Sequence, residues 1–153
     1  NPTLGFAEMY LNNEKVENQI RTIEVSRMVS KVAEISEVRA KLVEQQQAMG
    51  KDKGIVMDGR DIGTVVFPEA ELKLFMTASA ATRAQRRFDE LVEKGQAVTF
   101  DEVLQNVEER DYIDTHRDDS PLVKASGAIE IDNSAMSKTE QFELVLKLVK
   151  EKL

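Results

Sequence analysis

Short apolar runs alternate along the chain with longer segments of helical periodicity, and this alternation restricts the fold more than any other feature of the sequence. Residues 54–58, 72–76 and 128–131 have the length and composition of strands, the first of them buried. Helices are expected at about 16–33, 36–49 and 80–94, and after the capping boxes that open at Thr99 and Ser137. Strands that alternate with helices predict an α/β layer with a largely parallel sheet.

Most predicted helices have an apolar face that indicates what they bury. In chain order, the faces consist of Val25, Met28, Val29 and Val32; Ala84, Phe88, Leu91 and Val92; Phe100, Val103, Leu104 and Val107; and Phe142, Val145, Leu146, Val149 and Leu153. Ser36 is expected to cap the second helix, and Gly50 and Gly95 to end the second and third. Asn12 and Asn13 predict a turn in an otherwise irregular N-terminal segment, 1–13.

Composition and charge exclude several classes of protein. The 153 residues include no cysteine, which excludes disulfides and thiolate metal sites, and only one histidine, His116. No apolar run approaches the roughly 20 residues of a membrane span, and no signal-peptide pattern opens the chain, so we expect a cytoplasmic protein. The net charge of −7 argues against nucleic-acid and anionic-membrane partners. An anionic ligand would therefore need local clusters of arginine.

The first such cluster interrupts an apolar stripe. Beyond Val107, the core face of the helix that opens at Thr99 continues with Arg110, Asp111 and Asp114, and Arg117 follows three residues later. Charged residues on a core face indicate a functional site, because local rules fail most often at such sites. The alternative is that the helix leaves the core here and its end is solvated.

Two further clusters lie beside the predicted strands. Asp58, Arg60 and Asp61 follow the strand 54–58 and are interleaved with Gly59 and Gly63. Ligands bind at the carboxyl ends of parallel strands, and arginine suits phosphate, although surface ion pairs in a turn are an alternative. The second group, Arg83, Arg86 and Arg87, follows the strand 72–76, and taken alone it is explained more simply by an exposed helix surface. The GIVMDG sequence at 54–59 has the glycine spacing of a phosphate-binding loop, but Arg60 and Asp61 replace the lysine and hydroxyl residue that the motif requires.

Three segments together resemble the bacterial cytidylate kinases. They are IRTIEV at 20–25, MDGRDIGTVVFP at 57–68 and ERDYIDTHR at 109–117, followed by SPL at 120–122. The resemblance extends over essentially all 153 residues, and the DGRD-containing string is highly specific. It implies a P-loop nucleoside-monophosphate kinase with a three-layer α/β fold that transfers the γ-phosphate of ATP to CMP or dCMP.

The resemblance also implies roles for individual residues. Ser30, Arg39 and Asp61 match the residues that read cytosine, Arg110 and Asp114 match the sugar site, and Arg60 and Arg117 match the groups that hold the acceptor phosphate. Arg83, Arg86 and Arg87 match the helix beside the lid, and Arg86 is the candidate for contact with ATP phosphates. Arg60, Arg117 and Arg86 are thus the expected catalytic groups, and His116 is expected to be a bystander. The alternative for Arg39 is a structural pairing with Glu37, with Glu44 or with a neighbouring helix.

The sequence departs from the family in one large respect. It contains no phosphate-binding loop, no first strand and no DSGxxYR-like segment, so the expected fold is incomplete and most ligands of ATP and Mg²⁺ are expected outside this chain. Residues 1–53 correspond to part of the CMP-binding insert and the following helices, and 54–153 to the rest of the kinase core, with the lid at about 88–120. Three interpretations are open: part of a kinase that is monomeric and active when intact, a nucleotide-binding module, or a structural remnant that self-associates through unpaired strand edges.

Overall fold

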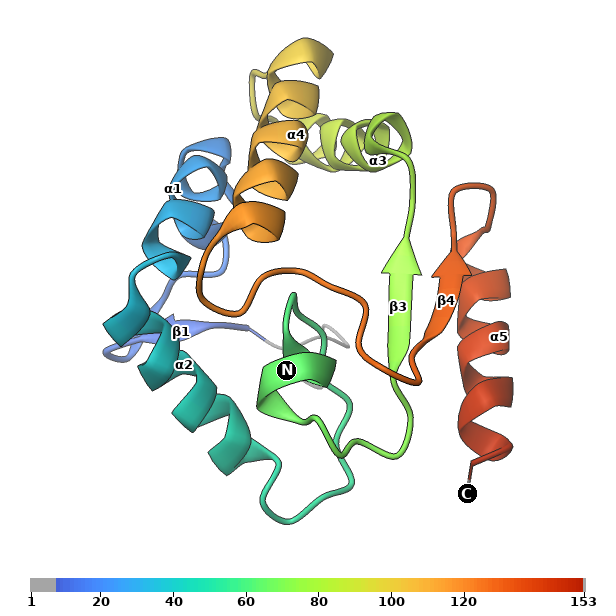
Figure 1. Ribbon diagram of the computed structural model, residues 1–153. Coiled ribbons are helices and arrows are strands. Elements are labelled where there is room, and N and C mark those ends of the chain that lie inside the picture. Colours follow the sequence, from blue (N-terminus) through green and yellow to red (C-terminus); the bar gives the residue numbers. More distant parts are fainter. Residues whose placement is uncertain (1–7, 153) are drawn as a thin grey trace.

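A computed structural model describes residues 8–152, which form five α-helices and two small sheets (Figure 1). In chain order the elements are β1 (Tyr10–Leu11), β2 (Glu14–Lys15), η1 (Gln19–Arg21), α1 (Ile23–Ala33), α2 (Ser36–Met49), η2 (Ile62–Val66), β3 (Leu74–Thr77), α3 (Ala80–Glu93), α4 (Phe100–His116), β4 (Ile129–Asp132) and α5 (Lys138–Lys150). None of the helices described is long and apolar enough to cross a membrane.

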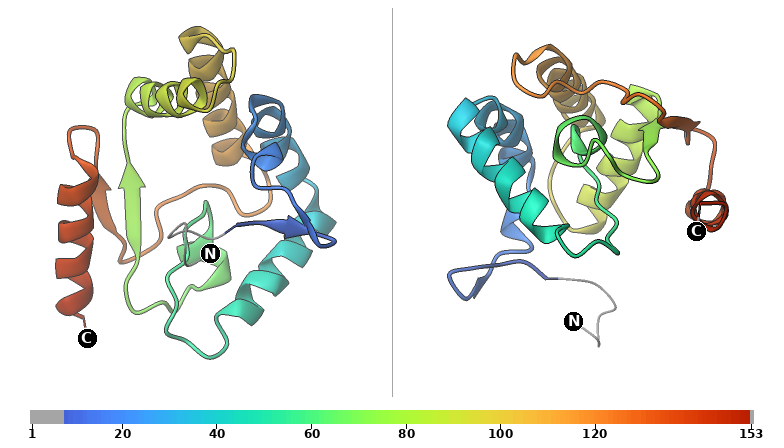
Figure 2. Two further views of the ribbon diagram at one scale, coloured as in Figure 1. Left: turned by 180° about the vertical axis from the view of Figure 1, so that it is seen from behind. Right: turned by 60° about the horizontal axis from the view of Figure 1, so that its bottom comes forward.

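The larger sheet is parallel, as predicted. Strand β3 pairs with β4 in the register Leu74↔Ile129 to Thr77↔Asp132, and α3 and α4 lie in the crossover between them. Helix α5 follows β4 and lies beside it at the edge of the molecule in both Figure 1 and Figure 2. The α/β class is therefore confirmed in a helix-rich form with a small sheet.

The predicted strand at 54–58 is wrong. This segment forms no strand, and Val56 is 97% exposed. A strand needs a neighbour to complete its backbone hydrogen bonds, and among residues 8–152 β3 pairs only with β4. Residues 54–58 thus have the apolar composition of a strand, but among residues 8–152 no neighbouring strand pairs with them.

The turn signal at Asn12 and Asn13 is confirmed. Both residues have positive φ, 49° and 68°, and they join β1 to β2 in a two-residue antiparallel hairpin. From Tyr10 onward, the N-terminal segment 1–13 is therefore more regular than expected. Residues 1–7 lie outside the part of the chain that the structure describes.

Both capping boxes form as the sequence predicts. The Thr99 and Ser137 side chains accept from the backbone N–H groups of Glu102 and Glu140, whose carboxylates accept in return from the cap N–H groups. Gly95, with φ of +74°, follows the end of α3. These signals depend on three or four adjacent residues, which explains why the sequence alone predicts them.

Two helix starts differ from the predictions. Helix α1 begins at Ile23 rather than near Val16, because extended Thr22 caps it by accepting from Val25 N–H at 3.4 Å. Helix α2 begins with Ser36, and Ile35 occupies the cap position without a side-chain hydrogen bond. The Ser36 hydroxyl donates instead to Asp119, a residue 83 positions away in the sequence.

The core lies where α1, α3 and α4 meet. Ile23, Ala84, Leu91 and Val103 are buried there, and partly buried Phe88, Val98, Phe100, Leu104 and Val107 pack around them. This confirms the predicted core face of α4 and most of that of α3. Val92 is the exception, at 49% exposure.

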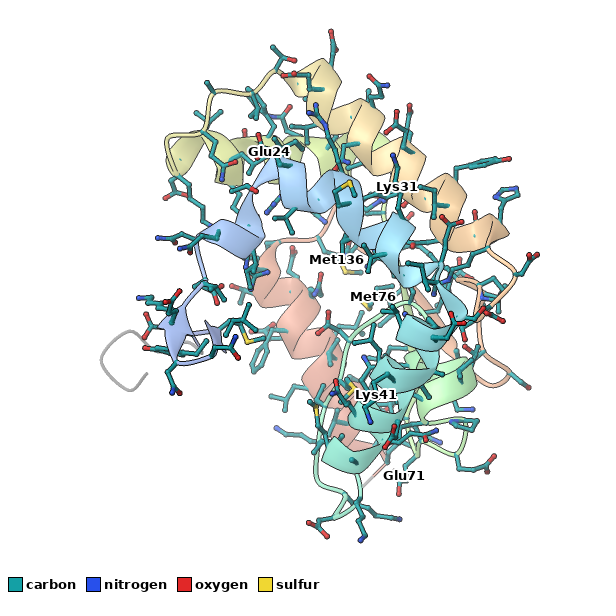
Figure 3. The ribbon with its side chains drawn as sticks, turned by 90° about the vertical axis from the view of Figure 1, so that its left-hand side faces the viewer. Glu24, Lys31, Lys41, Glu71, Met76 and Met136 are labelled. Atoms are coloured by element: carbon teal, nitrogen blue, oxygen red, sulfur yellow. The ribbon has the colours of Figure 1, made fainter. Side chains whose placement is uncertain are left out.

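The predicted apolar face of α1 is exposed rather than buried. Val25, Met28, Val29 and Val32 are between 40% and 55% exposed and line a groove with Leu42 of α2. Figure 3 shows this side of the molecule, with Glu24 and Lys31 on α1 and Lys41 on α2. Helix α1 instead turns Ile23 and Ser30 inward. On α5, Phe142 is likewise 65% exposed, and Leu153 lies outside the described residues.

Candidate functional site

Charged side chains are buried where α1, α2, the 58–61 segment and the end of α4 converge. The buried polar residues of the described chain are Ser30, Asp61, Asn106, Asp114 and Arg117, each less than 7% exposed. Asp114 and Arg117 are the charges that replace the apolar stripe of α4. A solvated helix end would leave them exposed, so that alternative is wrong. Buried charges need partners, and the partners define the site.

Arg39 and Asp61 form the pair closest to α2. Arg39 Nη2 donates to Asp61 Oδ1, and the two side chains are 11% and 1% exposed. Asp61 is fixed by its own backbone, because its carbonyl accepts from Val65 N–H at 2.9 Å and Val66 N–H at 3.2 Å where η2 begins. Arg39 therefore pairs with Asp61, and not with Glu37 or Glu44.

This pair is incompletely satisfied. Arg39 Nε and Asp61 Oδ2 are both buried and have no hydrogen-bond partner among the described residues. A buried donor or acceptor left unpaired costs about 1–3 kcal/mol, more when it is charged. One free donor and one free acceptor thus lie on neighbouring side chains, an arrangement that a ligand with complementary groups would satisfy.

Asp114 is the second anchor. Its Oδ2 accepts from Arg60 Nε at 3.0 Å, and its Oδ1 lies 3.7 Å from Arg117 Nη1. The Arg60 side chain is 41% exposed, whereas that of Arg117 is only 2% exposed. Arg60 is thus held through Nε while part of its side chain stays exposed, which suits a group that meets a ligand anion.

Arg117 is held by its own turn. The Ser120 carbonyl accepts from Arg117 Nε at 2.9 Å and from Nη2 at 2.6 Å. Burial lowers the pKa of Arg117, and the positive charge of Arg39 lowers it further. The guanidinium stays protonated near neutral pH, because arginine titrates far above that range. The protein thus holds the like charges of Arg117 and Arg39 near one another.

Arg110 joins α4 to α1. It donates through Nη1 to Ser26 Oγ at 3.1 Å and through Nε to Ser30 Oγ at 3.4 Å. Burial lowers its pKa, followed by the nearby charge of Arg60. Ser26 in turn donates to Asn106 Oδ1 at 2.8 Å.

The sequence analysis missed several residues of this network. Ser26 and Asn106 each lie four positions before a predicted site residue, Ser30 and Arg110, so helical spacing could have identified them. No local signal identifies Ser36, Asp119 or the Ser120 carbonyl, which meet their partners through the tertiary fold.

The three arginines of α3 do not join this cluster. Arg83 forms a bidentate pair with Asp111, at 2.8 and 2.5 Å, and donates from Nε to the Ala78 carbonyl. Arg87 donates to Glu90 and to the Arg21 carbonyl, both at 2.8 Å.

Arg86 is anchored to the loop that follows β4. It donates to Asn133 Oδ1 at 2.9 Å, to the Asn133 carbonyl at 2.7 Å and to the Met136 carbonyl at 3.4 Å. Contact with a ligand phosphate would require Arg86 to exchange these partners, so its role in ATP binding stays a prediction.

Neither a metal cluster nor histidine chemistry is indicated in residues 8–152. No group of three or more His, Asp or Glu side chains there is arranged to hold a metal ion. His116 is exposed, stacks on Tyr112 at 4.2 Å between ring centroids, and contacts the Tyr112 carbonyl through Nδ1 at 2.9 Å. It contacts none of the buried site residues through a hydrogen bond.

Comparisons with known proteins agree on one family. A family model described as cytidylate kinase matches residues 1–151. A cytidylate kinase of Flavobacterium johnsoniae is 74% identical over 151 residues, which are 99% of this chain and 66% of that protein. One from Flavobacterium psychrophilum is 73% identical over 97% of this chain and 66% of its own length. One from Bacteroides thetaiotaomicron is 57% identical over 99% and 68%. The chain thus spans about 66% of the length of the first two relatives.

Proposed function

Because this chain belongs to the cytidylate kinase family, we propose that the intact protein transfers the γ-phosphate of ATP to CMP or dCMP. The proposal includes the P-loop nucleoside-monophosphate kinase fold, of which the parallel β3–β4 pair and its helices would form part. The relatives are named cytidylate kinase, and the buried arginine–carboxylate cluster gives a physical reason for that substrate.

The unpaired atoms of Arg39 and Asp61 are the observation on which the proposal depends. Cytosine offers an exocyclic amine beside two acceptors, N3 and O2. The amine would donate to Asp61 Oδ2, and a ring acceptor would accept from Arg39 Nε. Both buried atoms would then have a hydrogen-bond partner. Uracil has a carbonyl in place of the amine, which would face the Asp61 carboxylate and be repelled. Ser30, buried beside Arg110, is the third residue proposed for base recognition.

The remaining cluster suits a sugar phosphate. We assign Arg110 and Asp114 to the sugar, whose hydroxyls can donate to the carboxylate. Arg60 and Arg117 are assigned to the acceptor phosphate, because both guanidinium groups lie against Asp114 at the same end of α4. A phosphate dianion there would offset the positive charges that now share one carboxylate.

The chemistry would depend on position and charge rather than on a covalent intermediate. An attacking phosphate held by Arg60 and Arg117 would meet the γ-phosphate of ATP in line. Closure of the lid region, about 88–120, would exclude water and protect ATP from hydrolysis. Mg²⁺ would neutralise the triphosphate charge when bound, but the described residues offer no cluster suited to it, and no step is assigned through the ion.

ATP recognition is only partly assignable to this chain. Arg83, Arg86 and Arg87 on α3 are proposed to face the ATP phosphates, with Arg86 the first candidate. The printed sequence has no GxxxxGK[ST] motif, which supplies most phosphate contacts in P-loop enzymes. A polypeptide limited to residues 1–153 is therefore expected to bind CMP without phosphorylating it, and its exposed apolar residues on α1 favour self-association.

Calorimetric titration tests the proposed site. CMP added to the 153-residue polypeptide should bind more tightly than UMP, and Asp61→Ala should reduce the difference. Asp58→Ala, at an exposed carboxylate three residues earlier, is the matched control and should preserve it. Equal affinity of the unmodified chain for CMP and UMP would contradict the assignment.

A further inference from the structure

The turn that follows α4 contacts both halves of the site. Ser120 has a φ of +52°, a left-handed conformation that is uncommon for a residue other than glycine. In this conformation its carbonyl accepts both hydrogen bonds from Arg117. The adjacent residue, Asp119, accepts from the Ser36 hydroxyl on the first turn of α2. Arg39 lies three residues after Ser36 on the same helix.

The contact between Asp119 and Ser36 is not part of a packed interface. A groove of about 490 Å³ opens between α2 and the turn, and its walls include Ser36, Arg39, Asp119 and Ser120. Close packing therefore does not fix the distance between α2 and the turn at this point. Nor does Ser36 cap its helix, since its hydroxyl donates across the groove instead. The Ser36–Asp119 hydrogen bond is therefore a direct contact between α2 and the turn across this groove.

We propose that Asp119 is a positioning residue that couples the base-binding helix to the phosphate-binding arginine. Through Ser36 it holds α2, and hence Arg39, at a set distance from the turn whose Ser120 carbonyl orients Arg117. The inference rests on the proposed function, because it assigns Arg39 to the base and Arg117 to the phosphate of one ligand. A nucleoside monophosphate fits both groups only if that distance is kept, so loss of the contact weakens CMP binding without altering either group.

Steady-state kinetics of the full-length gene product test this coupling. Asp119→Ala and Ser36→Ala should each raise the KM for CMP roughly 2- to 5-fold, as expected for one exposed hydrogen bond to a charged group. The double variant should be no worse than either single variant, because both remove the same contact. The KM for ATP should stay unchanged in all three.

Two matched variants separate the effect of the Ser36–Asp119 hydrogen bond from that of the Asp119 charge. Asp119→Asn keeps an oxygen that accepts from Ser36, and it should restore a KM for CMP near the wild-type value. Asp118→Ala removes the same charge from the neighbouring exposed position and should have no effect. Equal effects of Asp118→Ala and Asp119→Ala, additive single variants, or a parallel rise in the KM for ATP would overturn the proposal.

The wild-type assay distinguishes failure of the proposed Asp119 coupling from failure of the proposed function. If the wild type phosphorylates CMP and Asp119→Ala behaves as wild type, the coupling is wrong and the function stands. If the full-length wild type does not phosphorylate CMP, both are wrong.

Discussion

Arg39 and Asp61 lie 22 residues apart in the sequence and form a buried ion pair in which each side chain keeps one polar atom without a partner in residues 8–152. Arg39 comes from α2, and Asp61 precedes η2. An ion pair satisfied only within the protein would complete its own hydrogen bonds. One that leaves a donor and an acceptor free is suited to a ligand that offers the opposite pair of groups.

Removing the donor should weaken the choice of base. We expect Arg39→Met to lower kcat/KM for CMP by the equivalent of about 1–3 kcal/mol while changing the KM for ATP little. The variant leaves Asp61 and Ser30 to accept from an amine, which adenine also has. Catalytic efficiencies for CMP, UMP and AMP in wild type and variant measure the change. An unaltered preference for CMP would remove Arg39 from the site.

Replacing the acceptor should weaken the preference for CMP over UMP. Asp61→Asn presents an amide that can donate to the O4 carbonyl of uracil, so the ratio of kcat/KM for UMP to that for CMP should rise. We expect a rise of about tenfold, corresponding to roughly 1.4 kcal/mol. Asp61→Ala, which offers neither donor nor acceptor, is the comparison. If both variants changed the ratio equally, hydrogen-bond complementarity would not explain the choice.

The two phosphate-site arginines should differ in their effect on stability. Arg60→Ala and Arg117→Ala are each expected to cost about 2–4 kcal/mol in kcat/KM for CMP, since each removes a charged contact to the acceptor phosphate. Arg117→Ala should also lower the melting temperature, because it leaves Asp114 and the Ser120 carbonyl with fewer partners in a buried place. Arg60→Ala should lower it less, because Arg60 is more exposed and loses one hydrogen bond to Asp114, whereas Arg117 loses two to the Ser120 carbonyl. Near-native efficiency in both variants would refute the phosphate assignment.

The capping box of α4 should make stability depend on pH in a defined direction. Hydrogen bonds from Thr99, first its backbone N–H and then its hydroxyl, hold the pKa of Glu102 below its ordinary value of 4.5. A lowered native pKa stabilises the fold above the unfolded pKa, and this contribution is lost as the pH falls through the native pKa. The melting-temperature difference between wild type and Glu102→Ala should therefore be largest near neutral pH and shrink from about pH 5 downward. Asp101→Ala, in the same turn but outside the box, serves as control, and a difference independent of pH would contradict the assignment.

Local signals in the sequence predicted more of the fold than long-range ones. The capping boxes at Thr99 and Ser137 and the Asn12–Asn13 turn formed as expected, because each depends on a few adjacent residues. The strand at 54–58 did not form, since pairing depends on a neighbour that apolar composition does not specify. Val25 and Met28 show the same limit: helical periodicity identifies an apolar face, but not what covers it.

For the candidate site too, local sequence patterns were predictive and long-range contacts were not. The interruption of the α4 stripe at Arg110 and Asp114 pointed to the candidate site, and the burial of Asp114 excluded the alternative of a solvated helix end. The contact between Ser36 and Asp119 joins residues 83 positions apart and has no sequence pattern. Hydrogen bonds of this kind depend on how α2 lies against the turn after α4, which only the assembled fold determines.

Phosphoryl transfer measured directly is the most decisive test of the account. The full-length gene product, supplied with ATP and Mg²⁺, should form CDP from CMP and dCDP from dCMP far faster than it phosphorylates UMP or AMP. A polypeptide proved by intact mass to contain only residues 1–153 should show no measurable transfer, since removing a single preorganised donor can cost about 10²–10³ in rate and a phosphate-binding loop supplies several. Failure of the full-length protein to phosphorylate CMP, or robust turnover by residues 1–153 alone, would contradict the account.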